Sequence, residues 1–169
     1  MHARNKFQAV LRFVLGLCVS ALTHFTTIED AYYYFFQAKG TSDTLRGTDV
    51  KQRHLRTAVL LGWVAVDDAV AAFAVRRNLV WPRNCKGPAL LPRLQFIWRE
   101  LNHVAPDAAE FNRHRSVRNR IAHPSGVADT QLSVEQVDEL LDYCKAAIRV
   151  MYPHLVVGEE WKGRLSGFP

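Results

Sequence analysis

The segment Arg118-Asn119-Arg120-Ile121-Ala122-His123 combines three kinds of side chain that together can cleave RNA without a metal ion. At about 100° per residue, Asn119 and His123 share one helix face, and Arg118 lies beside them. A guanidinium neutralises a phosphate through paired hydrogen bonds, an amide orients an oxygen, and an imidazole moves a proton near neutral pH. Pro124 disfavours helical geometry at the preceding residue, so we expect His123 at the end of a helix.

The residues around this motif are mostly basic or polar, and we expect them to extend a phosphate-binding surface. No acidic residue occurs between Glu110 and Asp129. Surface helices without such a role usually mix both charges, so we expect Arg115, Arg120 and His114 to contact the RNA backbone. Glu110 and His114 also have a metal-ligand spacing, but no further ligand is near them in the sequence. We therefore expect neither a metal nor a cofactor.

Asp67 and Asp68 interrupt the apolar stretch from Ala58 to Val75. Carboxylates on a buried helix need partners, because desolvation of an unpaired charge is costly. We therefore expect an ion pair that orients Arg115 or Arg118, and this supporting role is favoured over acid–base catalysis.

Apolar residues at alternating spacings of three and four predict an all-α, up-and-down bundle of four main helices plus a short one, in a single domain over residues 1–169. The segment from Asn78 to Pro92 is rich in proline and basic residues and predicts a linker. A tail, residues 155–169, follows the last helix. The expected helices run from about Arg4 to Gln37, from Asp49 to Arg77, from Arg93 to Asn102, from Pro106-Asp107 through the motif, and from Ser133, capped with Gln136, to Pro153.

The composition bears on partners and location. The 22 Lys and Arg residues exceed the 16 Asp and Glu residues, so the formal charge is +6, which either favours polyanions or serves solubility alone. The three cysteines, Cys18, Cys85 and Cys144, are far apart and odd in number, which predicts a reducing cytoplasm. No membrane association is expected, because Asp67 and Asp68 interrupt the most apolar stretch. The apolar stripe from Phe7 to Phe35 continues unbroken, which argues against a signal peptide.

Arg118, Asn119 and His123 resemble the Arg-x4-His signature of the HEPN superfamily (higher eukaryotes and prokaryotes nucleotide-binding domains), in its form with Asn directly after Arg. The resemblance extends over residues 115–124 and fits a small helical chain with one long helix after the motif. It implies a metal-independent endoribonuclease of a toxin–antitoxin or antiphage-defence system. Two chains would form a homodimer with a composite active site, and an antitoxin or defence-system protein would be a further partner.

The resemblance also implies roles for the motif residues. Arg118 would stabilise charge on the phosphate, Asn119 would orient the scissile group, and His123 would be the general base or acid when the ribose 2′-OH attacks phosphorus. A 2′,3′-cyclic phosphate end would result.

Two other functions remain open from the sequence. The chain could be a catalytically inactive HEPN-like module that binds nucleotides or oligomerises with a partner. It could also be a plain helical interaction domain whose motif is coincidental. A nuclease needs Arg118 and His123 exposed and converging, a nucleotide binder needs a closed pocket, and a scaffold needs neither.

Overall fold

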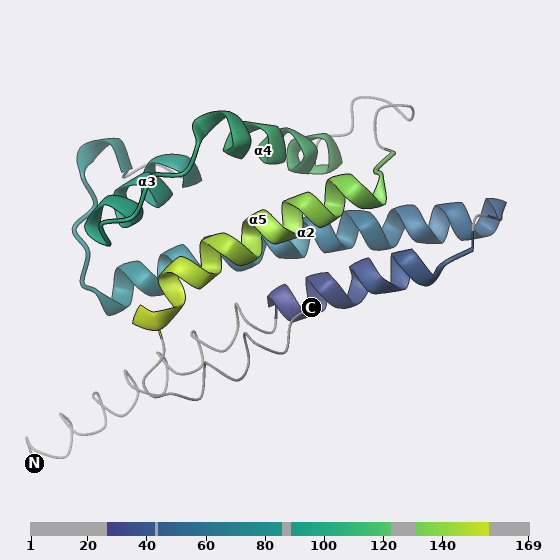
Figure 1. Cartoon of the computed structure of the whole chain (residues 1–169), viewed down its shortest axis with the longest axis horizontal. Coiled ribbons are helices and arrows are strands. Elements are labelled where there is room, and N and C mark those ends of the chain that lie inside the picture. The colour runs from purple at the N-terminus through teal and green to yellow at the C-terminus, as the bar shows by residue number, and fades with distance from the viewer. Residues whose placement is uncertain (1–26, 43, 86–88, 123–130, 156–169) are drawn as a thin grey trace, which may run out of the picture.

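The computed structural model describes residues 27–42, 44–85, 89–122 and 131–155 (Figure 1). Within these residues the regular structure is entirely helical, which confirms the predicted all-α bundle. The first helix covers residues 27–40 of the described chain. The further elements are α2 (Leu45–Arg76), η1 (Arg83–Cys85), α3 (Leu90–Glu100), α4 (Ala108–Ala122), α5 (Val134–Met151) and η3 (Tyr152–His154).

The packing of α2 against α5 forms the centre of the bundle, and Figure 1 shows the two helices side by side. Gly62 permits this close approach, because a Cβ atom there would lie 2.7 Å from Cδ2 of Leu141 on α5. The face of α2 that the sequence predicts to be inward is buried, and it includes Leu55, Val59, Gly62, Val66, Val70 and Phe73.

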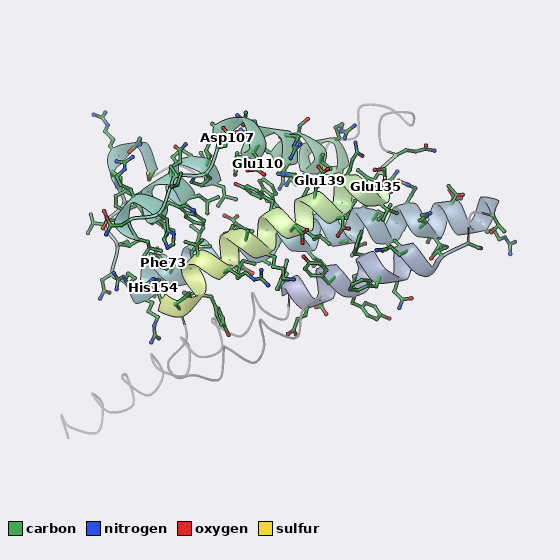
Figure 2. All side chains as sticks on the ribbon, viewed as in Figure 1. Phe73, Asp107, Glu110, Glu135, Glu139 and His154 are labelled. Atoms are coloured by element: carbon green, nitrogen blue, oxygen red, sulfur yellow. The ribbon has the colours of Figure 1, made fainter. Side chains whose placement is uncertain are left out.

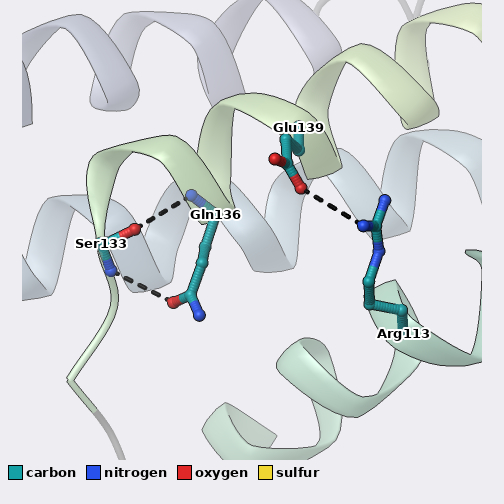
Figure 3. A network of polar contacts seen from close by, with 4 residues as sticks. All are labelled: Arg113, Ser133, Gln136 and Glu139. Carbon is teal, nitrogen blue, oxygen red and sulfur yellow. Dashed lines mark hydrogen bonds and ion pairs between the residues drawn. The ribbon is translucent and has the colours of Figure 1, made fainter.

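Side-chain caps set the starts of three helices. Ser133 forms the predicted capping box with Gln136: the Gln136 amide donates to the Ser133 hydroxyl at 3.1 Å, and the Ser133 amide donates to Gln136 Oε1 at 3.3 Å (Figure 3). Thr44 caps α2 by accepting a hydrogen bond from Gly47. Asp107 caps α4, since its carboxylate accepts from the Ala109 amide at 3.0 Å. Each cap supplies a hydrogen-bond acceptor to an amide of the first helical turn, which has no carbonyl partner within the helix.

The predicted linker is shorter than expected at its C-terminal end. α3 begins at Leu90 rather than near Arg93, so Pro92 lies in the first turn of the helix. The amides of that turn have no carbonyl partner within the helix, so proline loses no hydrogen bond there. α2 likewise begins at Leu45 rather than Asp49.

The helix directions follow from three contacts between α2 and the C-terminal elements. The Gln52 side chain both donates to and accepts from the backbone of Leu132, with both bonds 2.8 Å long. Gly62 faces Leu141, and the Phe73 ring meets His154 edge-on at 5.7 Å. From the first of these contacts to the third, the residue number rises in α2 and also in the C-terminal elements. α5 therefore runs parallel to α2.

α4 runs in the opposite direction. Its Arg113 lies 3.7 Å from Glu139 near the start of α5 (Figure 3), whereas Pro106, before α4, lines a common pocket with Val150 near the end of α5. α4 is thus antiparallel to α5 and, by the previous contacts, to α2. Figure 1 shows this arrangement, with α4 on one side of α5 and helix 27–40 on the other.

Among the described residues, α2 is the one helix long and apolar enough to cross a membrane by length and composition. About half of its most apolar window, 56%, is buried inside the bundle. The core helix of a helical bundle passes the same test.

Candidate nucleic-acid interface

The motif helix α4 buries one stripe of side chains, and the first residues of the motif lie beside that stripe. Phe111 and Val117 are buried, and Ile121 is partly buried against the core, as the sequence predicts. Arg115 is exposed. Arg118, Asn119 and Arg120, the first three residues of the motif segment, are half-buried at the edge of this stripe.

Arg118 and Asn119 contact each other. Nη1 of Arg118 donates a hydrogen bond to Oδ1 of Asn119 at 3.2 Å. This bond occupies one of the five guanidinium N–H groups and leaves the amide NH₂ of Asn119 as a further donor. The guanidinium and the amide therefore present neighbouring N–H donors, which can bind the oxygens of one phosphate.

The basic residues of α4 divide between two flanks. At about 100° per residue, Arg115, Arg118 and Asn119 fall within roughly 100° of arc, whereas Arg120 lies roughly 140° from Arg115. Arg113 shares the flank of Arg120 and pairs with Glu139 of α5. The structure therefore brings Arg115 together with the Arg118–Asn119 pair and places Arg120 on the other flank.

His123 lies outside the described residues, and α4 as described ends at Ala122, the residue before it. Its predicted position at a helix end, and its convergence with Arg118, stay predictions.

His114 is buried and does not form part of an RNA-binding surface, which corrects the prediction. Its side chain is only 2% exposed, and its ring stacks on Tyr143 of α5 at 4.9 Å between centroids. Burial, followed by the nearby charge of Arg113, lowers the pKa of this imidazole. The sequence did contain the signal: Phe111, His114, Val117 and Ile121 form one stripe at spacings of three, three and four.

This burial predicts a pH dependence of stability. Because the His114 pKa is lower in the folded protein, the unfolded chain takes up its proton at a higher pH. The stabilisation is complete above the unfolded pKa of about 6.5 and is lost as pH falls toward the folded pKa, by at most about 1.4 kcal/mol per pH unit. The pKa of His154 is also lowered by burial, so the wild-type slope contains two contributions.

We expect His114→Phe, which keeps the aromatic stack but cannot titrate, to flatten the decrease in unfolding free energy between pH 7 and 5. Urea unfolding at several pH values measures this slope. An unchanged slope in His114→Phe would show that His114 already protonates normally in the folded chain.

The expected burial of Asp67 and Asp68 is wrong, since both are exposed on α2. The sequence suggested burial because the flanking residues are apolar on nearly every side. In the structure, however, the aspartates belong to a strip of α2 that faces solvent, together with Leu60, Val64 and Val75. Water solvates exposed carboxylates well, so the desolvation argument for an ion pair does not hold, and the pairing with Arg115 or Arg118 stays a prediction.

Arg56 of α2 is a basic residue that the sequence reasoning missed. It precedes Trp63 by seven residues, two helical turns, and so lies on the same face of α2. Trp63 packs on Phe111 of α4 with ring centroids 5.4 Å apart, so this face points toward α4. Arg56 is half-buried.

The contacts across α5 set the register of α2 and α4. Gly62 faces Leu141, and His114 stacks on Tyr143 two residues further along α5. Counting equal steps from these contacts places Arg118 about level with Leu60, whereas the direct contact of Trp63 with Phe111 places it about level with Arg56. Arg56 therefore belongs to the end of the bundle at which the motif helix finishes.

Within the described residues, no group of three or more His, Cys, Asp or Glu side chains is placed to hold a metal ion. Cys85 and Cys144 are free and buried, and burial raises the pKa of the Cys144 thiol. A thiol that stays protonated is a poor nucleophile, so Cys144 is a packing residue.

The chain matches no protein-family model, and neither a curated protein nor a solved structure matches it. The class of protein is therefore defined by the fold alone, an all-α helical bundle. Its candidate interface is the Arg118–Asn119 pair with Arg115 on one flank of α4.

Proposed function

We propose that this protein is a metal-independent endoribonuclease of the HEPN type, acting in a toxin–antitoxin or antiphage-defence system. The hydrogen bond from Arg118 to Asn119 carries the proposal, because it joins a phosphate-binding cation and an orienting amide on one accessible flank. Arg115 lies on the same flank as a second cation, and His123 follows α4 directly in the sequence.

The reaction needs two proton transfers and no redox step. A base, assigned to His123 of one copy, takes the proton from the ribose 2′-OH, whose oxygen then attacks phosphorus. Arg118 stabilises the added negative charge on the phosphate oxygens, and Asn119 donates to one of them. The bond from phosphorus to the 5′-oxygen breaks, and an imidazolium, assigned to the second His123, protonates that oxygen. The products are a 2′,3′-cyclic phosphate and a 5′-hydroxyl.

The proposal is tested by incubating purified protein with mixed RNA in EDTA, with a magnesium-supplemented sample and an equal amount of DNA alongside. We expect equal RNA cleavage with and without magnesium and no cleavage of DNA, which lacks the 2′-OH. Cleavage that appears only with magnesium would refute the proposed mechanism.

We propose further that two copies pair at the part of the exposed strip of α2 that carries Leu60 and Val64 and ends before Asp67 and Asp68. Leu60 and Val64 are 37% and 48% exposed, and they lie one helical turn apart. Apolar side chains grouped on one helix face suit contact with a second copy, and two-fold dimers are the commonest oligomers. Pairing there brings both motif helices to one region and supplies two imidazoles.

A double substitution, Leu60→Glu with Val64→Glu, is expected to convert the dimer to a folded monomer and to remove cleavage. Four buried charges in the paired strip would repel each other and lose hydration. Light scattering at micromolar concentration measures the mass, and Val104→Glu, at a 93% exposed position away from α2, is the matched control. A wild-type monomer, or a variant that stays dimeric, would contradict pairing along this strip.

The alternative, an inactive nucleotide-binding module, gains no support from the pocket between α4 and α5. The charged residues that line it are three carboxylates and one guanidinium, which disfavour the phosphates of a nucleotide. None of Arg115, Arg118 and Asn119 lines it.

A further inference from the structure

A pocket of about 480 Å³ lies between α4 and α5, on the flank of α4 opposite Arg115. Figure 2 shows Glu110 of α4 and Glu139 of α5 on the two facing helices. α3 and the segment before α4 contribute Trp98 and Pro106. The other lining residues are Arg113, His114, Asp142, Tyr143, Ala146, Ala147 and Val150.

The pocket is acidic although the whole chain is basic. Glu110, Glu139 and Asp142 give three negative charges against one positive charge from Arg113, a local balance of −2 in a chain of formal charge +6. Arg113 is 3.7 Å from Glu139 and pairs with it across the rim, and both side chains are about 60% exposed. Asp142 accepts a hydrogen bond from the Tyr32 hydroxyl at 3.1 Å. The net negative potential at the mouth of the pocket therefore attracts cations.

His114 provides a second observation, independent of the acidic rim. Its side chain is 98% buried, it lines the pocket, and within the described part of the chain its imidazole makes no hydrogen bond. A ligand in the pocket could supply a hydrogen-bond partner to this imidazole. Burial also lowers the pKa of this imidazole, which therefore stays neutral near pH 7 and offers one nitrogen lone pair to an N–H donor.

Aromatic and aliphatic side chains form the remaining walls. Trp98 is 8% exposed, and Tyr143 is half-buried and stacks on His114. Ala147 and Val150 continue the apolar wall along α5. The faces of aromatic rings attract organic cations, and an apolar wall accommodates an alkyl chain.

We propose that this pocket binds an organic cation with an alkyl stem and a guanidinium or ammonium head, supplied by a free amine or by a basic side chain of another protein. The head would lie between Glu110 and Asp142 and donate to His114, and the stem would lie along Tyr143 and Val150. This site shares no residue with the Arg118–Asn119 pair, so it does not rest on the nuclease proposal.

The test uses two probes that carry the same head group, measured by calorimetry with the full-length protein. Agmatine represents a free amine, and the blocked peptide acetyl-Gly-Arg-Gly-amide represents a protein side chain. The peptide with citrulline in place of arginine is the matched control, because it keeps the shape and loses the charge. We expect at least one charged probe to bind and the citrulline peptide not to bind.

Glu110→Gln should weaken the charged probe about 1.4-fold to fivefold, the range expected for an exposed ion pair. Glu29→Gln, at an exposed carboxylate outside the pocket, is the matched variant and should change nothing. Binding of agmatine alone identifies a free amine, and tighter binding of the arginine peptide identifies a protein side chain. Failure of both probes to bind, equal binding of the citrulline peptide, or unchanged affinity in Glu110→Gln would overturn the proposal. RNA cleavage enters none of these outcomes.

Discussion

Replacing His123 with alanine is expected to reduce RNA cleavage about 10²- to 10⁴-fold, the usual contribution of a general acid or base. The affinity for RNA should hardly change, because a neutral imidazole contributes little to phosphate binding. Single-turnover cleavage and filter binding separate these two quantities. His103→Ala, at an exposed histidine outside the motif, is the matched control and should cleave normally.

Cleavage that continues undiminished in His123→Ala would show that another group moves the proton. Loss of cleavage accompanied by an equal loss of RNA affinity would instead assign His123 to binding. Either result would contradict the role proposed for this imidazole.

Arg118→Ala is expected to damage both binding and turnover, because the guanidinium contacts phosphate in the ground state and in the transition state. Loss of a charge-stabilising donor typically lowers kcat about 10²- to 10³-fold. The folded state should survive, since Arg118 is half-buried and its hydrogen bond goes to the neighbouring Asn119.

Arg113→Ala gives the matched control for Arg118→Ala. Arg113 lies on the same helix but on the other flank, paired with Glu139, and both of these side chains are about 60% exposed. Its loss removes the same charge without touching the proposed phosphate site. Equal defects in Arg113→Ala and Arg118→Ala would mean that overall charge, rather than the Arg118–Asn119 pair, governs activity.

The helices could be predicted from the sequence where periodicity and caps agree. Ser133 and Gln136 mark the start of α5 by a local capping box, and the stripe from Val137 to Met151 is buried as expected. The start of α3 differs from the prediction because proline is compatible with a first turn as well as with a linker, and Pro92 occupies the first turn.

Burial on α2 and α4 depended on tertiary packing that a single helix does not encode. Because α2 is apolar on nearly every side from Ala58 to Val75, its pattern could not indicate which strip would face solvent. That strip carries Asp67 and Asp68. His114 was placed on the surface by its residue type, although its spacing from Phe111 and Val117 matches the buried stripe.

The candidate site was predictable only within one helix. Helical geometry places Arg118 beside Asn119, and the structure adds the 3.2 Å hydrogen bond between them. The placement of Arg56 on the face of α2 toward α4 depends on the antiparallel packing of these helices, which is a long-range contact. The acidic pocket has the same origin, because α3, α4 and α5 each contribute to its lining.

The most direct test of the proposed reaction is the chemistry of the RNA ends. A short, 5′-labelled RNA is cut by the wild-type protein in EDTA, and the termini of both fragments are identified by mass spectrometry. Attack by the neighbouring 2′-OH predicts a 2′,3′-cyclic phosphate on one fragment and a 5′-hydroxyl on the other, with neither in the His123→Ala sample. A 3′-hydroxyl with a 5′-phosphate would show that water is the nucleophile and would contradict the mechanism.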